Sequence, residues 1–135
     1  EDMDALYNSF DAYISPHRAE GFGRGIIEVM LKGKAVAATA YSGPVEYFGD
    51  NCVYPLEYSI SHVGAAAIGD IKSHFTWADV FIESVMDAMN AFATDPSLCT
   101  QYGKRALAKM TKHHGPKAHG LACLKRLEEF QIGSS

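Results

Sequence analysis

Residues 11–30 read DAYISPHRAEGFGRGIIEVM, and this stretch decides the fold. Residues 12–15 form a short strand candidate that ends at Pro16, glycines follow at positions 21, 23 and 25, and an apolar helical pattern then runs to residue 31. Gly33 stops that pattern, as expected of a residue that accepts the left-handed conformation after a helix. A strand, a glycine-rich turn and a helix in direct succession predict a parallel α/β unit.

The segments after this unit continue the same rhythm. We expect a strand at 35–39, a turn at 41–44, a short helix at 45–48 and a third strand at 52–54. The strand at 35–39 is apolar on both faces, which is typical of a buried parallel strand. Residues 55–75 show no clear pattern and are expected to form a loop.

The last part of the chain is helical by its periodicity. Helices are predicted at 78–93, at 98–112 with Ser97 as its cap, and at 118–130, separated by Asp95-Pro96 and Gly115-Pro116. The methionine and phenylalanine stripe of residues 80–92 is expected to be core, and Trp77 a packing anchor.

These elements predict an α/β fold, the second half of a Rossmann-like domain with a short parallel sheet and a helical C-terminal extension. Residues 1–75 would form the partial nucleotide-sugar-binding half, and residues 76–135 the extension of the same domain. A three-stranded parallel sheet is small, so we expect further strands to come from a preceding part of a longer protein. The exposed sheet edge also predicts a homodimer of this chain.

Composition excludes several classes of protein. The 135 residues carry a net charge of −4, which argues against a nucleic-acid partner bound by phosphate neutralisation. No apolar run approaches the length of a membrane span. Three cysteines without a C-x-x-C pair indicate reduced thiols, and we therefore expect a cytoplasmic protein without a disulfide framework.

The chemistry is concentrated at the glycine-rich turn. A helix that begins after such a turn leaves backbone N–H groups free at its positive end, which suits a diphosphate. Glu20 precedes the turn, and Glu28 lies about 7–8 Å into the helix. Carboxylates accept hydrogen bonds from paired hydroxyls, so the two could bracket a nucleotide sugar, with its sugar toward Glu20 and its ribose toward Glu28.

Residues 11–54 closely resemble the donor-site stretch of family 4 retaining glycosyltransferases, which have the GT-B fold. The shared features are a strand that ends in Ser-Pro, the motif Glu-Gly-Phe-Gly, a second Glu eight residues after the first, a Gly-Lys-x-Val-x-Ala-Thr strand and a Ser-Gly turn. A weaker resemblance continues through Trp77 and the helix after it. The resemblance implies transfer of a hexose from a UDP- or GDP-sugar, with retention at the anomeric carbon and without a metal or other cofactor.

The resemblance also implies roles for individual residues. Glu20 would be the catalytic-site carboxylate that contacts the donor sugar, and Glu28 would bind the ribose. The other implied substrate-binding residues are Phe22, Gly23 and Arg24, whose N–H groups would hold the diphosphate, and Ser42 and Gly43, which would line the nucleotide side. The basic phosphate clamp and the acceptor site of such enzymes come from earlier parts of the protein, so this chain alone is expected to be inactive. Arg24 and Gly25 depart from the apolar residue and Pro that often follow Glu-Gly-Phe-Gly.

Other interpretations stay open. The chain could be a non-catalytic nucleotide-sugar-binding or interaction module, or a phosphorylase-like or epimerase-like GT-B enzyme. A dinucleotide fingerprint fits less well, because the third glycine follows the second by two residues where three are needed. Several side chains have both a ligand-binding and a structural interpretation: His17 and Glu46 as ligand contacts, and His113, His114 and His119 as metal ligands or solvated helix ends.

Overall fold

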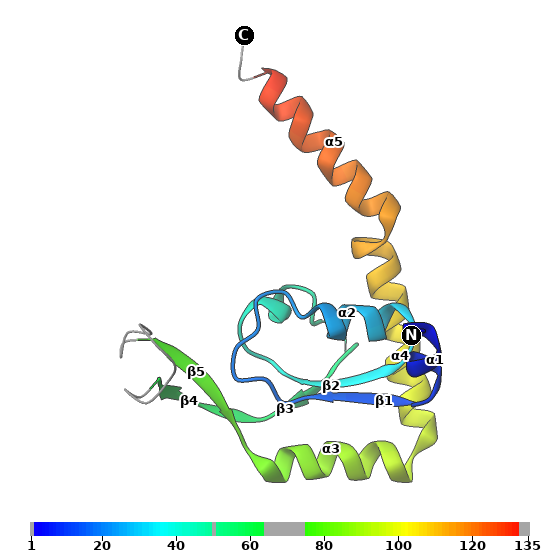
Figure 1. Ribbon diagram of the computed structural model, residues 1–135, viewed down its shortest axis with the longest axis vertical. Coiled ribbons are helices and arrows are strands. Elements are labelled where there is room, and N and C mark those ends of the chain that lie inside the picture. The colour runs from blue at the N-terminus through cyan, green and yellow to red at the C-terminus, as the bar shows by residue number, and fades with distance from the viewer. Residues whose placement is uncertain (1, 50, 64–74, 133–135) are drawn as a thin grey trace.

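The computed structural model describes residues 2–49, 51–63 and 75–132 (Figure 1). Its centre is a parallel sheet of β1 (Ala12–Ser15), β2 (Ala35–Thr39) and β3 (Tyr54–Leu56), in the order β1-β2-β3. The strands pair in parallel register, Ala12 with Ala35 and Ala37 with Tyr54. The expected α/β fold with a short parallel sheet is confirmed.

The burial of the central strand explains why four of its five residues are apolar. All five residues of β2 are buried, and the first four alternate between two hydrophobic clusters. Val36 and Ala38 face the cluster of α2 (Arg24–Leu31), whereas Ala35 and Ala37 face that of α3 (Ile82–Thr94). Figure 1 shows these two helices on opposite faces of the sheet. A strand covered on both faces favours apolar side chains, and its one polar residue, the buried Thr39, has its hydroxyl 3.5 Å from the carbonyl oxygen of Ser15.

The long helix α4 (Pro96–His114) joins the two clusters. Cys99, in its first half, belongs to the α3 cluster, whereas Ala106 and Met110, further along, belong to the α2 cluster. Its first turn is capped by Asp95, whose carboxylate accepts from the amides of Ser97 and Leu98, so the cap is not Ser97 as predicted. An Asp directly before a Pro at the first helical position is a strong helix start.

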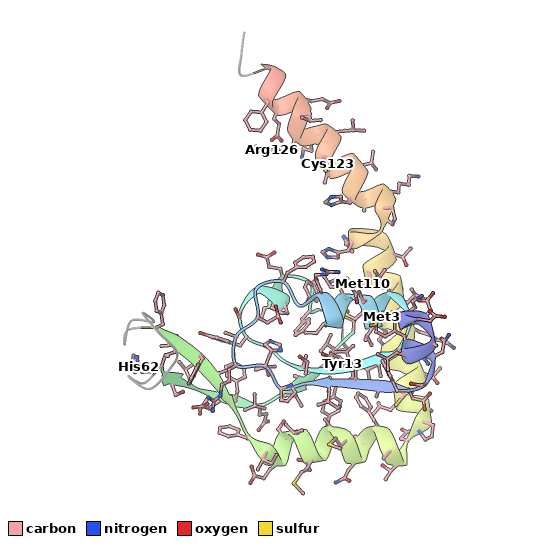
Figure 2. All side chains as sticks on the ribbon, viewed as in Figure 1. Met3, Tyr13, His62, Met110, Cys123 and Arg126 are labelled. Carbon is pink, nitrogen blue, oxygen red and sulfur yellow. The ribbon has the colours of Figure 1, made fainter. Side chains whose placement is uncertain are left out.

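The chain ends in helix α5 (Pro116–Ile132), which extends away from the sheet (Figures 1 and 2). Its large apolar side chains are exposed: Leu121, Leu124, Leu127 and Phe130. The predicted helical C-terminal extension is therefore present. Within the described residues, no helix combines the length and the apolarity that crossing a membrane requires.

Two short elements differ from the sequence prediction in position. The helix expected at 45–48 is a 3-10 helix, η1 (Gly43–Glu46), which starts earlier because Pro44 is pre-organised for its first turn. The strand expected at 52–54 begins two residues later, at β3 (Tyr54–Leu56). Cys52 and Val53, which suggested the earlier start, are buried but precede the paired residues. The sequence analysis also missed helix α1 (Met3–Asn8), which is capped by Asp2 and buries Tyr7.

The prediction of a loop at 55–75 was wrong for residues 55–63, which the structure describes and places mostly in strands. Strands β4 (Tyr58–His62) and β5 (Thr76–Val80) form an antiparallel pair, with Tyr58 opposite Val80 and His62 opposite Thr76. The helix predicted from residue 78 accordingly begins only at Ile82. Residues 64–74 of the predicted loop lie outside the described residues. β-branched and aromatic side chains in β5 favour the strand, and its pairing with β4 overrides the helical periodicity.

The stripe expected to be core is only partly buried. Ala88 and Phe92 are buried, but the side chains of Met86 and Met89 are each 55% exposed and Phe81 is 44% exposed. The apolar face of α3 is wider than the surface that a three-stranded sheet offers it. The prediction was therefore wrong for these three residues.

Candidate functional site

The candidate site lies where β1 and β2 end. The segment that follows β1, residues 16–23, is here called the glycine loop, and it leads directly into α2. The segment that follows β2 leads through Ser42 and Gly43 into η1. In parallel α/β sheets, ligands bind at the carboxyl ends of the strands, so these two segments occupy the expected place for a site.

Helix α2 starts without a side-chain cap. Gly23 adopts a left-handed conformation with φ +74°, and among the described residues no side chain caps the helix and no acidic residue lies in its first turn. The first hydrogen bond of the helix runs from the Ile27 amide to the Gly23 carbonyl, at 3.1 Å. Amides of the preceding residues therefore present the positive end of the helix dipole, which is the geometry of an anion site. The helix start predicted near Gly23 is confirmed.

The Ser42–Gly43 turn is bonded to the glycine loop. The carbonyl of Glu20 accepts from the Ser42 hydroxyl at 2.9 Å and from the Gly43 amide at 3.1 Å. A side chain at position 43 would place its Cβ 1.7 Å from the carbonyl oxygen of Gly21, so only glycine fits there. These contacts bring Ser42 and Gly43 against the backbone of Glu20; the ligand roles predicted for the three residues stay predictions.

Tyr47 supports the glycine loop from the core. Its side chain is almost fully buried, and its hydroxyl donates to the carbonyl of Phe22 at 2.6 Å. A Cβ at Gly23 would lie 2.5 Å from this hydroxyl, so Gly23 is needed both for its backbone conformation and for space. Burial, followed by the charge of Glu20, raises the pKa of Tyr47. Sequence reasoning missed this residue, since nothing in the local pattern shows that its hydroxyl points back at residues 22 and 23.

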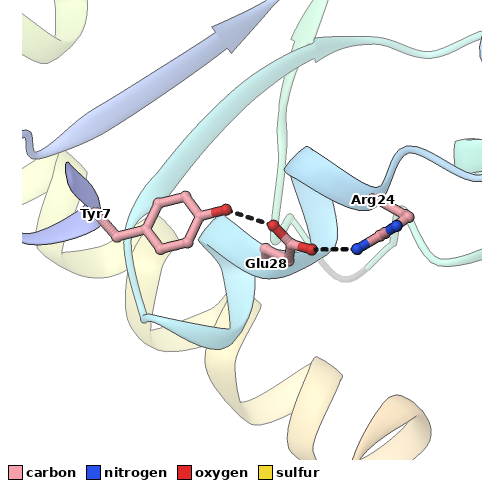
Figure 3. Close-up of polar contacts among 3 residues, drawn as sticks. All are labelled: Tyr7, Arg24 and Glu28. Atoms are coloured by element: carbon pink, nitrogen blue, oxygen red, sulfur yellow. Dashed lines mark hydrogen bonds and ion pairs between the residues drawn. The ribbon is translucent and has the colours of Figure 1, made fainter. Parts of the chain in front are cut away.

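The two carboxylates have different surroundings. Glu20 is exposed on the glycine loop. Glu28 is partly buried on α2, where Oε2 accepts a hydrogen bond from Tyr7 and Oε1 lies 3.4 Å from Nη2 of Arg24 (Figure 3). This hydrogen bond to Glu28 is the main reason why the pKa of Tyr7 is raised. Tyr7 is therefore a second residue that sequence reasoning missed; the helix that carries it was not predicted.

His17 bridges the ends of the two strands. Its Nδ1 lies 3.1 Å from the hydroxyl of Ser15, and its Nε2 lies 3.3 Å from the carbonyl oxygen of Tyr41. Nδ1 also lies 3.2 Å from the carbonyl oxygen of Ser15, so a proton on either ring nitrogen has an acceptor within the protein. Both ring nitrogens thus have partners within the protein, which favours the structural interpretation of His17 over a ligand contact.

The remaining candidate residues lie apart from one another. The ring of His114 contacts Tyr47 edge-on at 5.7 Å, whereas His119 lies on α5 with its Nε2 3.8 Å from the thiol of Cys123. Across the described part of the chain, no three His, Cys, Asp or Glu side chains are placed to hold a metal ion. Glu46 is exposed in the first turn of η1.

A cavity of about 600 Å³ lies at the opposite end of the sheet from the glycine loop. Its lining includes Asp11, just before β1, and Lys34, just before β2. It also includes Phe92 and Cys99, at the end of α3 and the start of α4. The glycine loop, by contrast, is exposed at Glu20, Gly21 and Phe22.

Comparison with known proteins gives one family match. Residues 1–53 match the model for glycosyl transferases group 1, which is less than half of the 135 residues. No curated protein matches the chain. The matched range contains the glycine loop, α2, β2 and the Ser42–Gly43 turn, and it ends before the β4–β5 hairpin. Together with the parallel α/β fold, the match supports a GT-B glycosyltransferase and thus glycosyl transfer in general.

Proposed function

We propose that this chain forms the donor-binding half of the active site of a retaining glycosyltransferase, which transfers a hexose from a nucleotide-diphosphate sugar. One observation carries the proposal. The uncapped start of α2, behind a left-handed Gly23, lies at the carboxyl edge of a parallel sheet within the range that matches glycosyl transferases.

The diphosphate would bind at this helix start. Backbone N–H groups of Phe22, Gly23 and Arg24 would donate to its oxygens, and the helix dipole would offset part of its charge. The Arg24 side chain is highly exposed and held by a long contact to Glu28, so it can turn toward a phosphate at little cost. Helix dipole and basic side chains together would supply the charge that a metal ion provides in other enzymes.

The two carboxylates would bind the two ends of the donor. Glu20, exposed beside the helix start, would accept from hydroxyls of the sugar near the reacting carbon. Glu28 would accept from the ribose hydroxyls, with Oε2 still held by Tyr7 and Oε1 freed from Arg24. Ser42 and Gly43 would line the nucleotide side. The acceptor and the remaining phosphate contacts would come from an N-terminal half outside these 135 residues.

Catalysis in such a site depends on charge and position. The acceptor hydroxyl oxygen would bond to the anomeric carbon as the bond from that carbon to the diphosphate oxygen breaks. Negative charge develops on the leaving diphosphate, which would take up the proton of the acceptor hydroxyl. Fixed amides at the start of α2 would stabilise that charge without reorganising during the reaction. Binding both ends of the donor would hold the anomeric carbon where the acceptor oxygen can reach it.

Calorimetric titration of the chain with UDP-glucose, GDP-mannose and ADP-glucose tests the proposal. At least one should bind, and Glu20→Gln and Glu28→Gln should each weaken that binding by about tenfold or more, because a hydrogen bond to a charged group contributes about 1.5–3 kcal/mol. Glu128→Gln, an exposed carboxylate on α5, is the matched control and should leave binding unchanged. Binding that is equal in all four proteins would show that the two carboxylates do not contact the donor.

A further inference from the structure

We infer that the β4–β5 hairpin is a working part of this site: through Arg18 it positions the loop that carries Glu20 and so sets recognition of the donor sugar. The inference rests on the proposed function. It makes Arg18, Trp77 and Asp79 positioning residues, two of them beyond the range that matches glycosyl transferases. Figure 1 shows the hairpin projecting from the same end of the sheet as the glycine loop.

Arg18 is held to β5 by its backbone and by its side chain. Its carbonyl accepts from the Ala78 amide at 2.8 Å, and its Nη2 lies 3.0 Å from Oδ1 of Asp79. The guanidinium also lies over the ring of Trp77, 4.5 Å from its centroid. A cation over an indole ring is the most favourable form of this contact. Three independent contacts to consecutive residues of one strand therefore fix a residue of the glycine loop.

The Asp79 carboxylate is itself held in place. The hydroxyl of Ser61, on the neighbouring strand β4, donates to Oδ2 of Asp79, which leaves Oδ1 for Arg18. One carboxylate thus joins both strands of the hairpin to the glycine loop. An ion pair that is partly exposed contributes little alone, and Oδ1 of Asp79 lies within ion-pair distance of Arg18 without hydrogen-bond geometry, so the hold on Arg18 also depends on the Ala78 amide and the Trp77 ring.

The hairpin also holds the second segment of the site. The hydroxyl of Tyr41 lies 3.2 Å from the carbonyl oxygen of Thr76 on β5, and the hydroxyl of Tyr58 on β4 donates to the carbonyl of Ala40 at 3.0 Å. These contacts fix the chain just before Ser42. Both segments that meet at the Glu20 carbonyl are therefore anchored to the same hairpin.

Of the groups proposed to contact the donor, Glu20 lies on the segment that the Arg18 contacts hold directly. Arg18 precedes Glu20 by two residues, whereas the amides proposed for the diphosphate are supported separately by Tyr47, beneath Phe22 and Gly23. Loosening the hairpin contact should therefore disturb Glu20 more than the start of α2. The specific consequence is a lost preference for the nucleotide sugar over the bare nucleoside diphosphate.

Asp79→Asn removes the charge from this contact with little change in shape. The measurement is the ratio of Kd values for UDP and UDP-glucose, and for GDP and GDP-mannose. We expect Asp79→Asn to reduce the preference for the sugar nucleotide by up to about fivefold while the Kd of the bare diphosphate stays the same. Asp87→Asn, an exposed carboxylate on α3, is the control and should change neither value. An unchanged preference in Asp79→Asn, or an equal loss for both ligands, would overturn the inference.

Amide hydrogen exchange gives a second readout that needs no ligand. In Asp79→Asn, amides of residues 18–23 should exchange faster than in the wild type, while amides of β2 should not. If the wild type bound none of the nucleotides, the proposed function would fail and the exchange result alone would decide whether the hairpin fixes the loop. Unchanged exchange at 18–23 would show that it does not.

Discussion

The hydroxyl of Tyr7 donates a hydrogen bond to Oε2 of Glu28, which ties helix α1 to helix α2 beside the glycine loop (Figure 3). Tyr7 is buried, so its position is fixed by packing before the hydrogen bond forms. Because Oε2 of Glu28 is bonded to Tyr7, only Oε1 can exchange its present partner, Arg24, for another. We therefore expect Tyr7 to control which way the Glu28 carboxylate faces.

Tyr7→Phe tests this relationship, because it removes the hydroxyl and keeps the ring. Glu28 should then turn more freely, and donor binding should fall to a value between that of the wild type and that of Glu28→Gln. Amides of α1 should also exchange faster. Calorimetry and hydrogen exchange measure the two effects. Tyr58→Phe, which removes another tyrosine hydroxyl away from Glu28, is the matched control for exchange in α1.

Tyr47→Phe should destabilise the chain. The carbonyl of the exposed Phe22 would lose its donor, the hydroxyl of the buried Tyr47. A hydrogen bond of this kind contributes about 0.5–1.5 kcal/mol. Urea unfolding at neutral pH measures the difference in the free energy of unfolding. A loss below a few tenths of a kcal/mol would mean that the Phe22 carbonyl finds another donor.

The same residue predicts a dependence on pH. Because burial raises the pKa of Tyr47 above its ordinary value of 10.0, the folded state holds this proton more tightly than the unfolded state. Its contribution to stability is fully present below the unfolded pKa and is lost as the pH rises through the folded pKa. From about pH 10 upward, the wild type should therefore lose stability more steeply than Tyr47→Phe. Parallel curves of unfolding free energy against pH would contradict this assignment.

The part of the fold that was predictable from sequence is the part with strong local patterns. Strand β2 is apolar at four of its five positions, and α2 follows a glycine turn and ends before another glycine, so both were located correctly. The hairpin was not predicted, since its strands depend on each other and on Arg18 far away in the sequence. Helical periodicity around residues 80–92 then extended the predicted helix backward into β5.

The candidate site shows the same division. Motifs singled out Glu20, Ser42 and Gly43, and the structure places Ser42 and Gly43 within hydrogen-bond distance of the Glu20 carbonyl, while their ligand roles stay predictions. Tyr47 and Tyr7 carry no motif, and their roles depend on which carbonyl or carboxylate the fold places against each hydroxyl. Periodicity likewise indicated an apolar face on α3 but could not show how much of it the sheet would cover.

Gly43→Ala should destabilise the chain strongly, whereas Gly21→Ala should not. A Cβ at position 43 would overlap the carbonyl oxygen of Gly21, and because this is backbone the Ser42–Gly43 turn must move away from the glycine loop. Overpacking of this kind costs about 1–3 kcal/mol. At Gly21 a Cβ would meet no atom within 4 Å. Gly21→Ala is therefore the matched control, because Gly21 is the other residue of the Gly43–Gly21 contact. Urea unfolding of both variants decides, and equal midpoints would place the two segments further apart than described.

Met110 and Met86 test the assignment of the core. Met110 is completely buried in the cluster between α4, α2 and the sheet (Figure 2), whereas the side chain of Met86 on α3 is 55% exposed. Met110→Ala would leave a cavity and should lower the free energy of unfolding by about 2–5 kcal/mol. Met86→Ala removes the same atoms from a solvated face and should change it by no more than about 0.5 kcal/mol. The variants share chemistry and helical context, so the difference between their losses of unfolding free energy isolates burial.

Similar losses for the two variants would show that the outer face of α3 is covered in solution. The measurement is urea unfolding at one low protein concentration and again at a much higher one. A loss for Met86→Ala that grew with concentration would assign that cover to a second copy of this chain.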